Sequence, residues 1–175
     1  MTQTSSPDAE ALYRTLRDQV QAALPDAERA QWSVAGIHSG GAWIAERLAA
    51  DLHLAGHGVI NVAFHRDDYA KKGLHSQAQP TTLPFDVQDR KILLIDDVLA
   101  TGRTIRAAVN ELFDYGRPAR VALAVLADRG GRELPAAADF VAAHVELPPG
   151  TTLVLSHEGS GAGMRFAFAV EATGN

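Results

Sequence analysis

Thirteen residues decide the fold: Ile92-Leu-Leu-Ile-Asp-Asp-Val-Leu-Ala-Thr-Gly-Arg-Thr104. The apolar residues 92–95 predict a buried strand, which ends at two adjacent carboxylates, Asp96 and Asp97. A Thr-Gly turn follows, and apolar residues then recur every three or four positions over residues 104–115. This spacing predicts a helix, so the segment has the order strand, acidic pair, tight turn and helix.

Each part of this segment has a use in binding a phosphorylated sugar. A helix N-terminus presents unpaired N–H groups and the positive end of the helix dipole to an anion. Gly102 lets the backbone approach that anion closely, and the hydroxyls of Thr101 and Thr104 add donors. Asp96 and Asp97 can accept hydrogen bonds from the neighbouring hydroxyls of a ribose. The segment therefore predicts a ribose-phosphate site, and the alternative is a capped helix after a strand with two exposed aspartates.

Short apolar strands alternate with helices along the rest of the chain. The pattern predicts strands at 32–37, 59–64, 92–95, 121–126 and 140–145, and helices at 8–24, 42–52 and 104–115. This alternation is typical of an α/β domain, in which a parallel sheet of about five strands is flanked by helices and binds ligands at the carboxyl ends of its strands. Segments 152–156 and 165–170 predict a C-terminal hairpin. Residues 65–84 lack periodicity and predict a loop longer than the ~12–15 residues common in compact domains.

Length and composition exclude several classes of protein. The chain has 175 residues and no cysteine, so we expect one domain, residues 1–175, without disulfides, thiol nucleophiles or cysteine-based zinc sites. The longest apolar run, residues 121–127, is far shorter than the ~18 residues of a membrane span. The N-terminus does not have the pattern of a signal peptide, and we expect a cytoplasmic protein.

Charge is unevenly distributed along the chain. The formal net charge is −5, which counts against a protein that works by binding nucleic acid. Residues 90–132 nevertheless hold eight basic and five acidic side chains. A basic stretch in an acidic protein favours an anionic small ligand, and the alternative is a set of solvated arginines on helix faces.

The segment 92–104 resembles the PRPP (phosphoribosyl diphosphate) signature of the type I phosphoribosyltransferases. Further motifs extend the resemblance to the PyrR family, the bifunctional pyrimidine-operon attenuation regulators with uracil phosphoribosyltransferase activity. These motifs are Phe64-His-Arg-Asp-Asp68, Pro84-Phe-Asp-Val87, Thr104-Ile-Arg-Ala-Ala108, Gly116-Arg-Pro118 and Leu126-Ala-Asp-Arg-Gly-Gly-Arg-Glu-Leu-Pro135. The resemblance spans residues 8–170 and implies the type I phosphoribosyltransferase fold, with a flexible flap at 65–84 and a small hood at 146–171.

The resemblance also implies a reaction and the residues that bind its substrate. Uracil and PRPP would give UMP and diphosphate, with Mg²⁺ bound through PRPP and no direct metal ligand from the protein. PRPP binding would fall to Asp96, Asp97, Val98, Leu99, Ala100, Thr101, Gly102, Arg103 and Thr104. Ser39, Gly40 and Gly41 stand where the family has the loop that holds the diphosphate, and a plain strand-to-helix turn is the alternative. Gly40 replaces the arginine usual in the family, which removes one charged contact to the diphosphate.

Catalytic roles are implied for Asp96 and Asp97, which would hold the sugar, and for Arg66 in the flap. Arg66, together with Lys71 and Lys72, would approach the diphosphate when the flap closes; surface charge on a mobile loop is the alternative. Cleavage of the C1′–O bond builds positive charge on the ribose and negative charge on the diphosphate. The base nitrogen attacks directly, so no protein nucleophile is expected.

Base recognition is implied for Phe140 and Val141, with a core aromatic as the alternative for Phe140. Ala137, Ala142 and Ala143 stand where relatives often carry Arg and Gly-Lys. We therefore expect weaker reading of the pyrimidine by side chains, and a phosphoribosyltransferase for another base remains an alternative.

A second function of the family is UMP-sensing attenuation of transcription through leader RNA. Arg117, Arg120 and Arg132 are candidate RNA contacts if a homodimer aligns them on one surface. Residues 1–31 hold three basic and five acidic side chains, whereas RNA binding needs cations to neutralise phosphates. We therefore expect an enzyme rather than a strong RNA-binding regulator.

Overall fold

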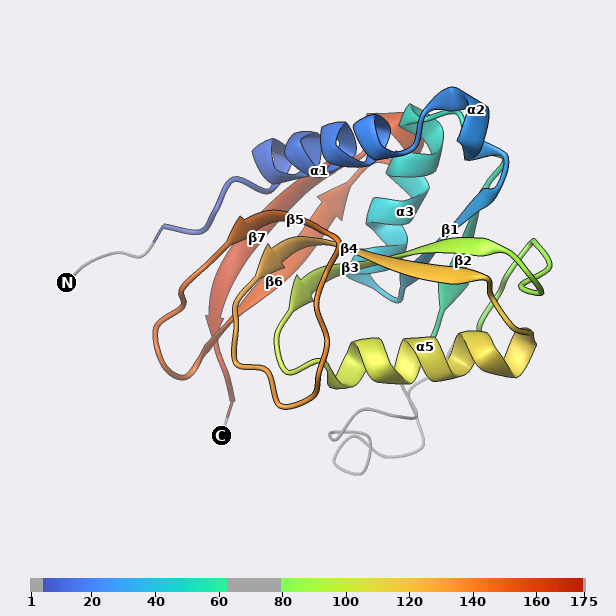
Figure 1. The fold of residues 1–175 in the computed structure, drawn as a ribbon. Helices are drawn as coiled ribbons and strands as arrows, with labels where there is room; N and C mark the ends of the chain where they lie inside the picture. Colours follow the sequence, from blue (N-terminus) through green and yellow to red (C-terminus); the bar gives the residue numbers. More distant parts are fainter. Residues whose placement is uncertain (1–4, 63–79, 175) are drawn as a thin grey trace.

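A five-stranded parallel sheet forms the centre of the computed structural model, which describes residues 5–62 and 80–174 (Figure 1). Its strands lie in the order β2-β1-β3-β4-β5, and every neighbouring pair is parallel. They are β1 (Trp32–Ile37), β2 (His57–Ile60), β3 (Lys91–Leu99), β4 (Arg120–Asp128) and β5 (Phe140–His144). The predicted α/β architecture is confirmed, and β3, which carries the acidic pair, lies at the middle of the sheet.

Helices cover both faces of this sheet. They are α1 (Ala9–Ala23), α2 (Asp26–Arg29), α3 (Gly40–Asp51) and α5 (Arg103–Tyr115). One core cluster packs α1 and α3 against one face, through Leu16 and Leu48 for example, and a second packs α5 against the other. Figure 1 shows α1 and α3 on one side of the strands and α5 on the opposite side. Burial on both faces explains why residues 92–95 are apolar without alternation.

The predicted C-terminal hairpin is present. It comprises β6 (Thr151–Glu158) and β7 (Arg165–Ala172), which pair antiparallel around a short 3₁₀ turn, η2 (Gly161–Gly163). Its apolar side chains, including Phe166 and Phe168, join the core cluster of α1 and α3. The hairpin is therefore an integral part of the α1–α3 layer.

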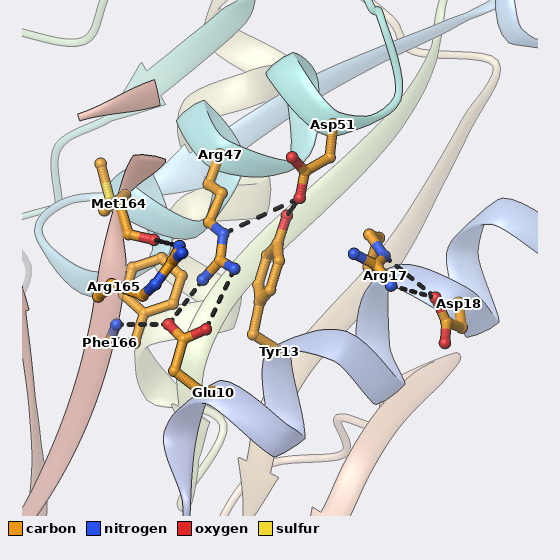
Figure 2. Close-up of polar contacts among 9 residues, drawn as sticks. All are labelled: Glu10, Tyr13, Arg17, Asp18, Arg47, Asp51, Met164, Arg165 and Phe166. Atoms are coloured by element: carbon orange, nitrogen blue, oxygen red, sulfur yellow. Dashed lines mark hydrogen bonds and ion pairs between the residues drawn. The ribbon is translucent and has the colours of Figure 1, made fainter. Parts of the chain in front are cut away.

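A buried ion pair fastens the hairpin to both helices (Figure 2). Arg47 of α3 is 6% exposed and donates to both carboxylate oxygens of Glu10 in α1, at 2.7 and 3.1 Å. Glu10 Oε1 also accepts from the backbone N–H of Phe166 in β7, at 2.7 Å. The Arg47 guanidinium lies 3.9 Å from the centre of the Tyr13 ring, and the Tyr13 hydroxyl donates to Asp51 at 2.6 Å. Helix α1, helix α3 and strand β7, which are far apart in sequence, are thus joined around the Arg47 guanidinium.

The pKa values of this cluster follow from its geometry. Burial alone would raise the pKa of Glu10, but the Arg47 guanidinium and the Phe166 amide outweigh burial and hold that pKa below its usual value. Burial and the hydrogen bond to Asp51 raise the pKa of Tyr13. Glu10 is therefore ionised and Tyr13 neutral at neutral pH.

Some predicted boundaries are wrong, and pairing with a neighbouring strand explains two of them. Strand β3 does not end at residue 95 but runs through both aspartates to Leu99, because β4 continues to pair with it as far as Asp128. The last part of the predicted 65–84 loop is tied to β2, since Thr82 and Val59 exchange backbone hydrogen bonds of 2.8 Å. Helix α2 was not expected, and residues 63–79 lie outside the described part of the chain. No helix in the described residues is long and apolar enough to cross a membrane.

Candidate active site

The turn that follows β3 is held from one side by a single downstream segment, residues 129–134. The carbonyl of Leu99 accepts from the Arg129 amide at 2.9 Å. The carbonyl of Thr101 accepts from the amides of residues 133 and 134 at 2.9 and 3.0 Å. Between them, the carbonyl of Ala100 accepts from the Arg132 guanidinium at 2.8 Å. Three successive carbonyls therefore point toward segment 129–134.

This arrangement decides where the neighbouring N–H groups point. In a planar trans peptide the C=O of one residue and the N–H of the next point in opposite directions. The amides of Ala100, Thr101 and Gly102 consequently point away from segment 129–134, and none of them donates a hydrogen bond within residues 5–62 and 80–174. Successive unpaired amides form a concave anion-binding nest. We call these three N–H groups the amide nest.

Helix α5 begins at the edge of the amide nest. Gly102 precedes it with φ +91°, a left-handed conformation that favours glycine, and an added Cβ would lie 3.1 Å from the Cβ of Ala136. The Thr101 hydroxyl accepts from the Arg103 amide at 3.2 Å. Arg103 itself is exposed and pairs with Glu133. The partial positive charge of the helix N-terminus adds to the attraction of the nest for an anion.

The two aspartates lie on β3 directly before the nest. Asp96 is 7% exposed and Asp97 is half-buried, so the alternative of two exposed aspartates does not describe them. Each uses its Oδ1 to accept the next backbone N–H at 2.9 Å, Asp96 from Asp97 and Asp97 from Val98. Strand alternation places Asp97 on the face covered by α3 and Asp96 on the face covered by α5. The carboxylates thus lie on the two sides of one strand at its carboxyl end.

The loop at residues 39–41 packs against this strand end. A Cβ on Gly40 would lie 2.5 Å from Oδ2 of Asp97, and a Cβ on Gly41 would lie 2.2 Å from the carbonyl oxygen of Ile95. Glycine at both positions is therefore required for the start of α3 to lie directly on β3. The peptide bond between His38 and Ser39 is cis. The structure brings together the two segments that sequence analysis assigned to PRPP, 39–41 and 96–104.

Two residues predicted to bind PRPP, Val98 and Leu99, direct their side chains into the core. Leu99 is buried in the core beside α5, and Val98 packs against the core beside α1 and α3. Arg66, Lys71 and Lys72 lie outside the described residues.

Sequence analysis missed the partner of Arg132, although both residues lie in the quoted 126–135 motif. Arg132 donates to Asp128 through two nitrogens, at 2.9 and 2.5 Å, and to the carbonyl of Ala136 at 2.8 Å. The Arg132 hydrogen bonds outweigh burial and lower the pKa of Asp128, which ends β4 and is 8% exposed. Four donor contacts, including the one to Ala100, engage the Arg132 side chain inside the protein.

The other two candidate RNA contacts lie at the opposite end of β4. Arg117 and Arg120 are exposed and stand at the start of that strand, whereas Arg132 follows its end. The strand has nine residues, and eight steps of about 3.3 Å separate its two ends by roughly 26 Å. Within one chain these three arginines do not form a single patch.

The proposed base-binding residues lie on β5. Phe140 is half-buried and packs against the core beside α1 and α3, as a core aromatic would. The carbonyl of Val141 accepts from the side chain of Gln19 in α1 at 3.1 Å. Ala137 lines a cavity of about 590 Å³ between α5 and β4, next to Leu134 and Gly102. Gly102 of the turn lines this cavity, whereas Asp96 and Asp97 do not.

The carboxylates are the groups here that fit a hard cation. Mg²⁺ prefers oxygen ligands and is usually held by one or two carboxylates together with substrate phosphates. Asp97 has its Oδ2 beside Gly40, where residues 39–41 meet the end of β3. Among the described residues, no group of three or more His, Cys, Asp or Glu could hold a metal ion alone.

Comparison with known proteins places this geometry in a family. Residues 7–148 match the family described as phosphoribosyl transferase domain. A curated relative from Ralstonia nicotianae, named bifunctional protein PyrR, is 63% identical over 164 residues, which cover 94% of each chain. A protein of the same name from Nitrosococcus oceani is 49% identical over 157 residues, covering 88% of this chain and 89% of the relative.

Solved structures show the same fold at low identity. A hypoxanthine-guanine-xanthine phosphoribosyltransferase has a TM-score of 0.58 at 17% identity and covers 79% of this chain and 76% of its own. A hypoxanthine-guanine phosphoribosyltransferase from Bacillus anthracis has a TM-score of 0.60 at 13% identity, covering 81% and 84%.

Proposed function

Because the chain belongs to the phosphoribosyltransferase family and resembles its PyrR members over nearly its full length, we propose that it transfers the phosphoribosyl group of PRPP to uracil. The products are UMP and diphosphate. The observation that carries this proposal is the amide nest directly after two aspartates at the carboxyl end of the central strand. Parallel α/β sheets bind their ligands at that edge.

Each part of PRPP has a chemically suitable partner. The amide nest and the start of α5 receive the 5′-phosphate through backbone N–H groups. Asp96 and Asp97 accept hydrogen bonds from the ribose hydroxyls. The N-terminus of α3, at residues 39–41, receives the diphosphate next to Asp97. Mg²⁺ bound through PRPP would neutralise charge on the leaving diphosphate, and Asp97, whose Oδ2 lies beside Gly40, would be a carboxylate close to it.

The reaction follows from the bond that breaks. A ring nitrogen of uracil forms a bond to C1′ while the C1′–O bond breaks, and the diphosphate leaves with the electron pair. The uracil N–H proton is released to solvent. Fixed amide dipoles stabilise the charge that grows on the leaving group, and the carboxylates stabilise the positive charge on the ribose. Arg66 is assigned to the departing diphosphate by resemblance alone.

The choice of uracil comes from the PyrR resemblance. Ala137, Ala142 and Ala143 offer no polar side chain to a base, so backbone groups of β5 must supply the recognition. The Val141 carbonyl is one such group: it accepts from the Gln19 side chain and keeps a second lone pair for an N–H of the base.

RNA binding is the second proposed activity, because the high-identity relatives carry the name bifunctional protein PyrR. We propose that it is weak, because Arg132 is engaged inside the protein and the chain carries a net charge of −5. A homodimer would be needed to gather Arg117 and Arg120 from two chains. The proposed location is the cytoplasm, where PRPP and a pyrimidine base would be met.

A base-by-base assay tests the proposal. The protein is incubated with PRPP, Mg²⁺ and one of uracil, hypoxanthine, guanine, adenine or orotate, and the nucleotide product is separated by chromatography. We expect a nucleotide product only in the reaction with uracil, and we expect that product to be UMP. Turnover of another base would overturn the uracil assignment, and no PRPP consumption with any base would overturn the enzyme assignment.

A further inference from the structure

We propose that Arg132, oriented by Asp128, is a positioning residue for PRPP: it keeps the amide nest open toward the 5′-phosphate. This inference rests on the proposed function, because it assigns a role at the same site. Arg132 itself touches neither the sugar nor the phosphates in this proposal. It acts through the carbonyl of Ala100.

The peptide between Ala100 and Thr101 is oriented by Arg132. Its carbonyl is held at 2.8 Å by Nη1 of Arg132, so its N–H faces the opposite side, where the nest is. Without that donor the peptide can rotate. Rotation would replace a hydrogen-bond donor in the nest with a carbonyl oxygen, which repels a phosphate.

Among the three carbonyls that define the nest, one depends on a side chain. The carbonyls of Leu99 and Thr101 are held by backbone amides, which persist in any variant other than proline. The carbonyl of Ala100 is held by a side chain, 32 residues away in sequence. The central peptide of the nest is therefore the one that a substitution at Arg132 can release.

Arg132 is itself held by Asp128 and by the backbone. Nη1 and Nη2 donate to the two carboxylate oxygens of Asp128, and Nε donates to the carbonyl of Ala136. A bidentate pair fixes the plane of the guanidinium, which a lysine ammonium cannot reproduce. Asp128 is itself fixed at the end of β4 and accepts the Gly130 amide at 2.9 Å. The pair thus sets the direction in which Nη1 meets Ala100.

The test compares three variants for PRPP binding and turnover. Arg132→Ala removes the donor, Arg132→Lys keeps the charge beside Asp128 but loses the planar fork, and Arg129→Ala is the matched control. Arg129 lies in the same segment, but its side chain donates to Thr152 rather than to the turn. We expect Arg132→Ala and Arg132→Lys to raise the KM for PRPP by ~10- to 100-fold, the range expected for a displaced binding group. Arg129→Ala should stay within about threefold of the wild-type protein, because it keeps the backbone amide that donates to Leu99 and removes a side chain that does not contact the turn.

Chemical rescue separates positioning from general stability. Free guanidinium added to Arg132→Ala should restore part of the PRPP affinity, measured by calorimetry without uracil, and should do nothing for Arg132→Lys. If Arg132→Ala does not fold, Arg132→Lys carries the test through its KM for PRPP.

Two results would overturn the proposal: an unchanged KM for PRPP in folded Arg132→Lys, or an absence of rescue in folded Arg132→Ala. If the wild-type protein binds PRPP but makes no UMP, only the uracil assignment is refuted. The PRPP affinities of the variants would then still decide the role of Arg132. An unchanged protein that does not bind PRPP would refute the proposed function and this inference with it.

Discussion

The Glu10–Arg47 ion pair should dominate the stability of the layer formed by α1, α3 and the hairpin. Arg47→Met keeps most of the apolar stem but removes the cation from a position that is 6% exposed. Glu10 then loses two hydrogen bonds and keeps the one from the Phe166 amide. Removing one member of a buried ion pair costs about 3–5 kcal/mol, because an unpaired charge stays behind.

The magnitude follows from the exposure of the two side chains. Glu10 keeps 21% of its side chain exposed, so water offsets part of the loss and the lower end of that range, about 3 kcal/mol, is expected. In a domain of this size each kcal/mol lowers Tm by about 2–4 °C, so Arg47→Met should lower Tm by roughly 6–12 °C.

A double-mutant cycle measures the interaction itself. Arg47→Met, Glu10→Gln and the double variant are unfolded in urea, and the coupling free energy should be about 1–3 kcal/mol. The exposed pair Arg17–Asp18, drawn beside it in Figure 2, is the control and should couple by less than about 1 kcal/mol. Equal coupling for the two pairs would refute the reasoning.

The remaining predictions concern pH, the acidic pair, the turn and RNA. Glu10 and Asp128 both have lowered pKa values in the folded protein, so their contribution is present at neutral pH and is lost as pH falls; the urea midpoint should drop below about pH 4.5, and a flat midpoint down to pH 3 would contradict this. Asp96→Asn with Asp97→Asn should abolish UMP formation at unchanged far-ultraviolet circular dichroism, and retained turnover would remove the ribose assignment. Gly102→Ala should cost about 1–2 kcal/mol of stability and most of the PRPP affinity, because φ is +91° there; calorimetry with unchanged affinity would argue against the nest. Filter binding of the operon's own leader RNA should be weak and vanish at physiological salt, whereas nanomolar, UMP-enhanced binding would restore the regulator.

Periodicity explains why the fold could be predicted from the sequence. Apolar residues follow a continuous pattern in the helix predicted at 104–115 and in the strands predicted at 32–37 and 121–126. The ends of these elements in the structure differ from the predicted ends by at most three residues. Residues 39–41 were linked to PRPP by the family resemblance, and the structure brings them to residues 96–104 because the carboxyl ends of parallel strands share one edge of a sheet.

Long-range side-chain contacts explain what could not be predicted. The bond from Arg132 to the carbonyl of Ala100 has no periodic signal, so its arginine was assigned to RNA by charge alone. The end of β3 at Leu99 is set by its partner β4 and not by its own composition, which turns polar at Asp96. The Gln19 contact to Val141 crosses 122 residues and depends on how α1 packs on β5.

The dependence of the nest on segment 129–134 makes ligand binding and folding a single equilibrium. An unfolded chain has no such nest, because its carbonyls are held by contacts that exist only when β4 pairs with β3 and segment 129–134 lies against the turn. PRPP should therefore bind the native state and not the unfolded one, and at a hundredfold excess over its Kd it would add about 2.7 kcal/mol to the free energy of unfolding. A rise in PRPP concentration would then lower the unfolded fraction of the protein as well as fill its binding site.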